Sequence, residues 1–191
     1  MWQKSERTWL LPKTASSSKS QSEIKKAIKQ ENKTKEGVAS KTINKFLANV
    51  PNFYGCFASN ELDNLLIDSL PFSLIVNFDL SGSQGSHWIA LHISKRCIEF
   101  FDPLGFDLDS WPTFPSKLIR FIQNLSYRRQ LVISRRLQPE NSTLCGYYCI
   151  YFIFLRQTNS FNQITNTFSL DLTVNDSLLS NYLSKIDFNK F

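Results

Sequence analysis

The chain has 191 residues, of which 42% are hydrophobic and 14% aromatic, and its formal net charge at pH 7 is +6. This length suits one domain of ordinary size with a substantial core, to which sixteen Phe residues contribute bulk. No apolar run is long enough to cross a bilayer, and residues 1–6 are unlike a signal peptide, so neither a membrane protein nor a secreted one is expected.

The cysteines bear on the cellular compartment and on metal binding. They form no CxxC pair and no paired metal-ligand spacing. This pattern favours a reduced, intracellular setting, and neither a metal site nor a cofactor is predicted. The cysteines are Cys56, Cys97, Cys145 and Cys149.

The positive charge is concentrated in the first fifty residues. They hold eleven Lys or Arg and four Asp or Glu, whereas the remainder holds eleven and twelve. A polar cluster over 14–22 and a charged run over 23–36 predict a disordered or marginally helical arm, residues 1–50, before a domain over residues 51–191. The apolar group 9–11 could dock onto the domain. Two interpretations of the arm stay open: a solvated tail with no partner, and a tether for nucleic acid.

Hydrophobic periodicity predicts the elements of the domain in chain order. Helices and strands are mixed along the chain without an internal repeat, which indicates an α+β fold. The expected elements are a helix over 60–69, a buried strand over 74–78, a loop over 80–86, strands over 87–93 and 96–102, a helix over 116–125, a strand over 131–137, an apolar helix at Cys145, and a last helix over 177–186 capped by Asn175-Asp176.

The two central strands are expected to form a hairpin around Ser94-Lys95. In that register His87 lies directly opposite Asp102 on one face of the sheet. The pair suits a carboxylate that holds an imidazole in one tautomer beside a nucleophile. Ser-Lys is not a preferred two-residue turn, and a slip by one residue would separate the two side chains. His92 lies on the opposite face and is the weaker candidate for a base.

Cys145 lies where a polar stretch turns into the apolar run 147–155. Ser142 or Thr143 is expected to cap the helix, which places Cys145 in the first turn, near free backbone N–H groups and the positive end of the helix dipole. A helix N-terminus or a neighbouring imidazolium favours the thiolate, which is the nucleophilic form of cysteine. The run is apolar on all sides, which predicts a helix buried in the core.

Two neighbours add to the pattern around Cys145. Gly146 allows another chain segment or a substrate backbone to approach closely, and Gln138, seven residues before the cysteine, supplies an amide donor. A cysteine taken alone is more often an inert core residue. The other three cysteines are interpreted in that way.

Taken together and in this order, these motifs resemble those of the adenovirus maturation proteases, the adenain-like cysteine proteases. Related enzymes of adenovirus-like mobile elements and invertebrate DNA viruses look similar, and all share a catalytic core with the SUMO-specific proteases. The resemblance covers about residues 53–154, at most to Ile186, and leaves the first fifty residues unexplained. It rests on segments 55–62, 75–77, 85–88 and 101–105 and on Gln138 with Cys145-Gly146.

The resemblance implies a central mixed sheet with a buried helix that carries the nucleophile. Cys145 would be that nucleophile, His87 the general base and later the acid, and Asp102 the orienting acid, where adenovirus enzymes usually have glutamate. Gln138 would donate its side-chain amide to the oxyanion beside the backbone N–H of Cys145, and removing such a donor typically costs about 2.7–4 kcal/mol. Trp88 either lies against the catalytic centre, as in the family, or is a plain core residue.

The function implied is that of a thiol protease, a hydrolase that cleaves viral or mobile-element precursor proteins near glycine. An activating peptide and nucleic acid are further partners that it suggests, with the nucleus or a virion as location. The alternatives are a host-type protease for ubiquitin-like modifiers and a non-catalytic nucleic-acid- or capsid-binding protein on the same fold. Arg128-Arg129 and Arg135-Arg136 are interpreted as solvated residues or as a patch for nucleic acid or an acidic partner.

Overall fold

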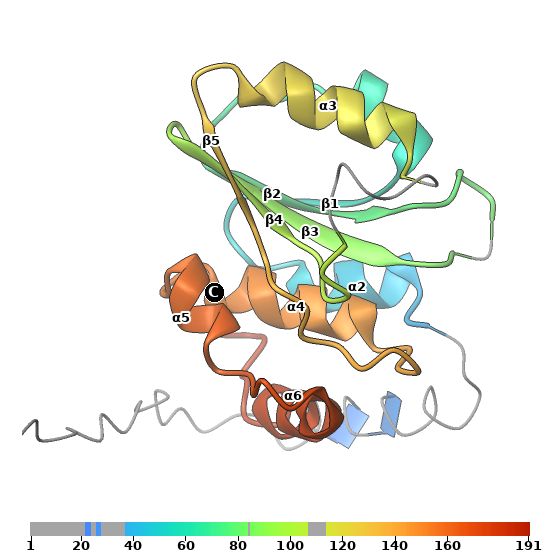
Figure 1. Cartoon of the computed structure of the whole chain (residues 1–191), viewed down its shortest axis with the longest axis vertical. Helices are drawn as coiled ribbons and strands as arrows, with labels where there is room; N and C mark the ends of the chain where they lie inside the picture. Colours follow the sequence, from blue (N-terminus) through green and yellow to red (C-terminus); the bar gives the residue numbers. More distant parts are fainter. Residues whose placement is uncertain (1–21, 24–25, 28–36, 84, 107–113) are drawn as a thin grey trace, which may run out of the picture.

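The centre of the protein is a five-stranded mixed sheet, seen in the computed structural model of Figure 1. The structure describes residues 22–23, 26–27, 37–83, 85–106 and 114–191. The strands follow chain order across the sheet, parallel for β1 with β2 and for β4 with β5, and antiparallel in the centre. Their bounds are β1 Phe53–Ala58, β2 Phe72–Asn77, β3 Trp88–Ile93, β4 Cys97–Phe101 and β5 Gln130–Ile133.

Helices cover both faces of the sheet, which gives three layers (Figure 1). On one face lies α3 (Ser116–Ser126) with the 3-10 helix η1 (Ser59–Asn64), and on the other face lies α4 (Cys145–Leu155) beside α2 (Ser40–Leu47). The predicted α+β fold with a central mixed sheet is confirmed. The short elements that follow α4 are α5 (Phe161–Thr165), the 3-10 helix η2 (Leu172–Val174) and α6 (Asn175–Leu183).

Strands β2 and β3 are buried on both faces because most of their residues are apolar. Every residue of β2 and β3 is buried. Side chains alternate between the faces, so Leu74 packs with the α3 layer while Ile75 packs with the α4 layer. α4 itself lies inside the core: all residues from Cys145 to Phe154 are buried, as its all-round apolar sequence predicts.

The central hairpin has a different register from the predicted one. His92 lies opposite Glu99, so the prediction that Asp102 lies directly opposite His87 is wrong. The turn spans residues 94–97, and the N–H of Ser94 donates to the carbonyl of Cys97 at 2.9 Å. The ladder is therefore shifted by two residues from the prediction. Because side chains alternate with a period of two, this shift keeps His87 and Asp102 on the same face.

The predicted helix over 60–69 is wrong in type and in length. The segment forms only the 3-10 helix η1, which ends at Asn64. Its start is fixed by Glu61, whose Oε2 accepts the N–H of Ala58 at 2.7 Å. Leu62 is the single apolar residue of η1 that is buried, so the segment has too little apolar face to sustain a longer helix.

Two later elements need smaller corrections. The strand predicted over 131–137 ends at Ile133, and the N–H of Leu137 donates instead to the carbonyl of Pro103 at 2.9 Å. α6 begins at Asn175, whose side chain does not cap the helix. That side chain is fully buried and donates to the carbonyl of Leu137 at 2.8 Å, which ties α6 to the segment after β5.

The folded domain begins before residue 51, so the predicted boundary at residue 50 is too late. Val38 is 2% exposed, and Ile43 and Leu47 are completely buried, all in the core around α4. The reason is local: apolar residues recur at helical spacing from Ile43 to Val50, which is the pattern of an amphipathic helix. α2 therefore belongs to the domain.

Little of the predicted arm falls within the described residues. Lys45 Nζ of α2 lies 3.4 Å from Glu23 Oε2, and Ala27 packs against the core around α4. The predicted docking group 9–11 lies outside the described residues. Among the residues that are described, no helix combines the length and the apolar character needed to cross a membrane.

Candidate active site

Cys145 is the first residue of α4. The N-cap is Leu144, and neither Ser142 nor Thr143 caps the helix as predicted. Ser142 Oγ instead accepts the N–H of Leu144 at 3.2 Å and stabilises the turn before the helix. The first N–H groups of a helix have no acceptor within the helix. The thiol therefore lies beside its own free backbone N–H and the positive end of the dipole.

His87 contacts both of its predicted partners. Its Nε2 lies 2.8 Å from Asp102 Oδ1, and its side chain is hydrogen bonded to Cys145 as well. His87 directly precedes β3 and is 5% exposed. The rings of Phe78 and Phe106 are nearly perpendicular to the imidazole, with ring centroids 5.0 and 6.1 Å away. The imidazole is thus held between a carboxylate and a thiol.

The surroundings of His87 raise its pKa. Burial is the largest single effect and lowers the pKa, but the hydrogen bonds to Asp102 and Cys145, together with the negative charges of these groups, outweigh it. The pKa rises from 6.5 to about 9. The imidazole therefore stays protonated through neutral pH, and a protonated imidazole beside a thiol stabilises the thiolate.

Asp102 is completely buried and held by several donors. Besides the bond to His87, its Oδ1 accepts the N–H of Leu104 at 2.9 Å and its Oδ2 the N–H of Phe106 at 3.1 Å. Ser134, which the sequence analysis did not single out, bonds both main-chain groups: its Oγ accepts the N–H of Asp102 at 2.9 Å and donates to its carbonyl at 2.8 Å. These bonds fix the carboxylate toward the imidazole.

Gln138 lies in the same site, 1% exposed, and lines the groove beside Cys145. Its Nε2 donates to the carbonyl of Ser142 at 2.7 Å. Its Oε1 is the one completely buried side-chain polar atom without a partner in the described part of the chain. Leaving such an acceptor unpaired costs about 1–3 kcal/mol. The structure thus brings Gln138 to the predicted place, with one amide N–H committed to the loop before Cys145.

A contact between distant segments shapes the start of α4. Trp88 Nε1 donates to the carbonyl of Val38 at 3.0 Å. A Cβ added to Gly146 would lie 2.1 Å from Val38 Cγ1 and 3.2 Å from Trp88 Cδ1. Only glycine therefore fits after Cys145, as the predicted close approach requires. Trp88 lies against Gly146, the residue after Cys145, and it is also part of the core around α4, so both of its interpretations hold.

Val38 is a site residue that the sequence analysis missed, because it was assigned to the arm. It lies two residues before the amphipathic segment 40–47, and this position was the only signal in the sequence for its role. Residues 37–40 line a groove of about 860 Å³ together with Cys145 and His87. Among the residues that line this groove, Glu61 is the one carboxylate, and there is no Lys or Arg.

The other cysteines lack the surroundings of Cys145. Cys149 Sγ donates to the carbonyl of Trp88 at 3.4 Å, and burial raises its thiol pKa well above the ordinary value. Burial also raises the pKa of Cys56 to about 12, although this residue lines the groove. Cys97 Sγ lies 3.2 Å from Ser94 Oγ. Within the described residues, no group of three potential metal ligands occurs.

Three of the four arginines interpreted as solvated or patch residues donate hydrogen bonds to main-chain carbonyls. Arg129 Nε donates to the carbonyl of Ser94 at 2.9 Å, and Arg135 Nη2 donates to the carbonyl of Phe168 at 2.8 Å. Arg136 Nε donates to the carbonyl of Gln138 at 3.3 Å, but Arg136 is exposed, as is Arg128. The patch interpretation is therefore restricted to one residue of each pair.

Comparison with known proteins identifies the fold. No family model matches the chain, and no curated protein matches it. The crystal structure of the ASFV pS273R protease is similar over 76% of this chain with a TM-score of 0.52 and 16% sequence identity, and this chain spans 64% of the length of that protease. The SUMO protease Ulp1, with its catalytic cysteine oxidised to a sulfenic acid, has a TM-score of 0.47 and 16% identity over 92% of this chain and 96% of Ulp1. The Ulp1 protease domain in complex with Smt3, the yeast ortholog of SUMO, has a TM-score of 0.46 and 16% identity over 91% of this chain and 95% of that domain.

These similarities concern the fold. At 16% identity, the match to the pS273R protease shows that the chain shares the fold of that protein. The predicted architecture, a mixed sheet against a buried helix that begins at Cys145, is confirmed.

Proposed function

We propose that the protein is a thiol protease, a cysteine endopeptidase in which Cys145 is the nucleophile. The observation that carries this proposal is the contact of His87 with both Cys145 and Asp102. The contact lies at the start of a buried helix, beside a groove that is large enough for a peptide. The shared fold of the pS273R protease supports the same conclusion.

The arrangement accounts for both halves of peptide hydrolysis. The thiolate of Cys145 attacks the carbonyl carbon of the scissile bond, and the electron pair of the C=O bond moves to its oxygen. Protonated His87 then gives its proton to the leaving amine as the C–N bond breaks. In the second half, neutral His87 takes a proton from water, which attacks the thioester and releases Cys145. Asp102 holds the imidazole in place through both steps.

The oxyanion would be stabilised by two donors at the helix start. One is the backbone N–H of Cys145, which has no acceptor within α4. The other is the second amide N–H of Gln138, because the first is committed to the carbonyl of Ser142. That bond also fixes the side chain, so the donor does not have to reorganise during the reaction.

The substrates that we propose are polypeptides with glycine near the cleaved bond, in viral or mobile-element precursor proteins. Trp88 and Val38 both line the groove next to Cys145 and pack on Gly146. Bulky side chains therefore line the groove next to Cys145, which favours a substrate residue without a side chain. Nucleic acid and an activating peptide are further partners in this proposal. The protein would be located in the nucleus or in a virion.

Electrophilic probes of three kinds test the proposal against its alternatives. A glycine-terminated peptide, ubiquitin and SUMO would each carry a C-terminal thiol-reactive group, with Cys145→Ala as the control protein. Rapid Cys145-dependent labelling by the peptide supports the endopeptidase, whereas preferential labelling by ubiquitin or SUMO supports a protease for such modifiers. If no probe reacts with the folded protein, a non-catalytic binding protein on this fold becomes the better explanation.

A further inference from the structure

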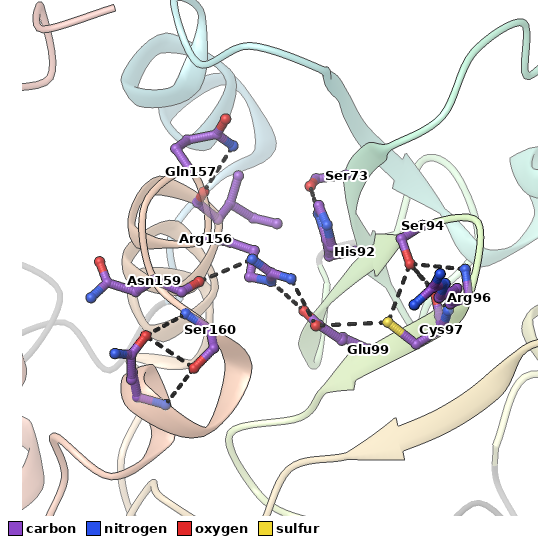
Figure 2. Close-up of polar contacts among 12 residues, drawn as sticks. Ser73, His92, Ser94, Arg96, Cys97, Glu99, Arg156, Gln157, Asn159 and Ser160 are labelled. Carbon is purple, nitrogen blue, oxygen red and sulfur yellow. Dashed lines mark hydrogen bonds and ion pairs between the residues drawn. The ribbon is translucent and has the colours of Figure 1, made fainter.

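A second cavity of about 580 Å³ lies at the other end of β3 from His87. Two buried polar residues, His92 and Ser73, line it together with Arg156, which follows α4, and Lys95 of the β3–β4 turn. Figure 2 shows His92 with Ser73, and Arg156 with Glu99, at this end of the sheet. None of the lining residues is an aspartate or a glutamate.

The hydrogen bonds of His92 define which ring nitrogen carries its proton. Nδ1 lies 2.8 Å from Ser73 Oγ. The hydroxyl of Ser73 has no other acceptor among the described residues, so we assign it as the donor to Nδ1, which puts the proton of the neutral ring on Nε2. Nε2 has no hydrogen-bond partner in the described part of the chain. It is not sealed in the core either, because Gln138 Oε1 is the one fully buried unpartnered atom there.

Arg156 also has donors to spare. Its Nε and Nη2 donate to the two carboxylate oxygens of Glu99 at 2.6 and 3.0 Å, and its Nη1 donates to the carbonyl of Asn159 at 3.0 Å. A guanidinium group has five N–H bonds, so two remain. The Arg156 side chain is 22% exposed, whereas that of Glu99 is 6% exposed. The carboxylate therefore holds the guanidinium in place from the protein side.

We propose that this cavity is a binding site for a phosphate group, as the free dianion or as a small phosphate ester. The cavity is lined by His92, which has the Nε2–H to donate, by Arg156, which has two spare N–H bonds, and by Lys95, and no Asp or Glu lines it. Such a set of donors matches the several acceptor oxygens of one phosphate group. Because an anion beside an imidazole favours its protonated form, phosphate that binds there raises the pKa of His92.

The chain provides its own internal control for a test, because it has two histidines. In proton NMR spectra of the full chain, phosphate should shift the imidazole signals of His92 in a saturable manner and leave those of His87 in place. Sodium chloride of equal ionic strength should shift neither. AMP, tested separately, shows whether an ester is accepted as well as the free ion. If the His92 signals stay unchanged with both ligands, or if both histidines respond alike, the proposal is wrong.

A pair of lysine variants separates a specific site from general attraction of anions. Lys95→Gln should weaken phosphate binding up to about fivefold, as expected for an exposed ionic contact. Lys185→Gln removes the same charge from another exposed position and should leave the affinity unchanged. An equal effect of the two substitutions would overturn the proposal. Neither result depends on proteolytic activity, so this test stands apart from that of the proposed function.

Discussion

The two histidines lie toward the two ends of β3, and both are almost completely buried, yet their pKa values shift in opposite directions. His87 is 5% exposed and contacts Asp102 and Cys145, and its pKa is raised to about 9. His92 is 8% exposed and has the hydroxyl of Ser73 as its partner. Burial is the main cause that lowers its pKa, and the positive charge of Arg156 lowers it further. The negative charge of Glu99 acts in the opposite direction, and the resulting pKa is about 4. Burial acts alike at both ends, so the charged partners decide the outcome.

The opposite pKa shifts of His87 and His92 indicate different chemistry at the two ends of β3. At neutral pH, His87 is a cation between two acidic groups, which is the state needed to support a thiolate and then to protonate a leaving amine. His92 is neutral and lines a cavity together with Arg156 and Lys95, which is suited to binding rather than to proton transfer. Substitutions placed in matched pairs at the two ends should therefore have unequal effects on activity.

The largest difference is expected between Cys145 and Cys97, which lies at the His92 end. Cys145→Ala should abolish peptide hydrolysis because the proposed nucleophile is removed, whereas Cys97→Ala should leave most of it, as should Cys56→Ala and Cys149→Ala. Alkylation monitored by mass spectrometry should be fastest at Cys145 near neutral pH. Equal labelling of all four thiols in the folded protein would contradict the assignment.

A glutamine at each end gives the second comparison. Gln138→Ala should lower kcat by about 10²–10³-fold with little change in KM, because its amide acts on charge that develops in the transition state. Gln138→Glu should be at least as harmful, since it places a carboxylate near the oxyanion. Gln157→Ala, in the second cavity, should leave kcat unchanged. A change in KM alone for Gln138→Ala would make this residue a substrate-positioning contact.

Stability against pH tests the neutral state of His92. Its pKa is lowered in the folded state, so its contribution is fully present above pH 6.5 and is lost as the pH falls through about 4. The loss is about 3 kcal/mol of unfolding free energy, from the shift in pKa. Urea unfolding at a series of pH values should show this loss in the natural chain and a flatter curve for His92→Gln. Parallel curves for the two proteins would show that His92 does not titrate in this way.

Asp102→Asn tests the charged state of His87. Burial lowers the pKa of His87 and Asp102 helps to raise it, so loss of the carboxylate charge should lower that pKa. The imidazolium is lost as the pH rises through the folded pKa, so the alkaline limb of kcat/KM should begin near pH 9 in the natural chain and lower in the variant. A pH profile with an unchanged alkaline limb would remove Asp102 from this role.

Sequence patterns were sufficient where the cause of the structure is local. The all-round apolar run predicted the buried helix at Cys145, and the ordered motifs with their family resemblance indicated Cys145, His87, Asp102 and Gln138, which the fold brings together. The expected fold class followed from the order of the elements. The helix and the fold class depend on neighbouring residues in the chain, whereas the four site residues, which lie far apart in the sequence, were indicated by the order of their motifs and by the resemblance.

The patterns failed where distant contacts decide. Val38 is fifty residues from Trp88, and Ser134 is 32 residues from Asp102, so neither contact has a local signal. The hairpin register depended on the four-residue turn that begins at Ser94, which the strand pattern did not specify. The placing of His87 and Asp102 on one face survived this error because a shift of two residues preserves the face.

The smallest effect on catalysis is expected from the N-terminal arm. Deleting residues 1–36 should leave hydrolysis of a short peptide unchanged, because the four proposed catalytic residues and Val38 remain. The same deletion should remove most binding to nucleic acid, since the positive charge is concentrated in that part of the chain. Binding by the full chain should weaken steeply with rising salt, because counterion release makes log K fall with log salt.

A slightly longer deletion, of residues 1–39, provides the matched control. It also removes Val38, which accepts the indole N–H of Trp88 and packs on Gly146. Hydrolysis of the short peptide should therefore fall with this deletion although it survives the shorter one. Peptide assays and binding measurements over a salt series, on the full chain and on the two deletion variants, test both expectations.

Equal nucleic-acid affinity with and without residues 1–36, or binding that is insensitive to salt, would leave the arm as a solvated tail. Equal peptidase activity of the two deletion variants would show that residues 37–39 are not needed to position the nucleophile.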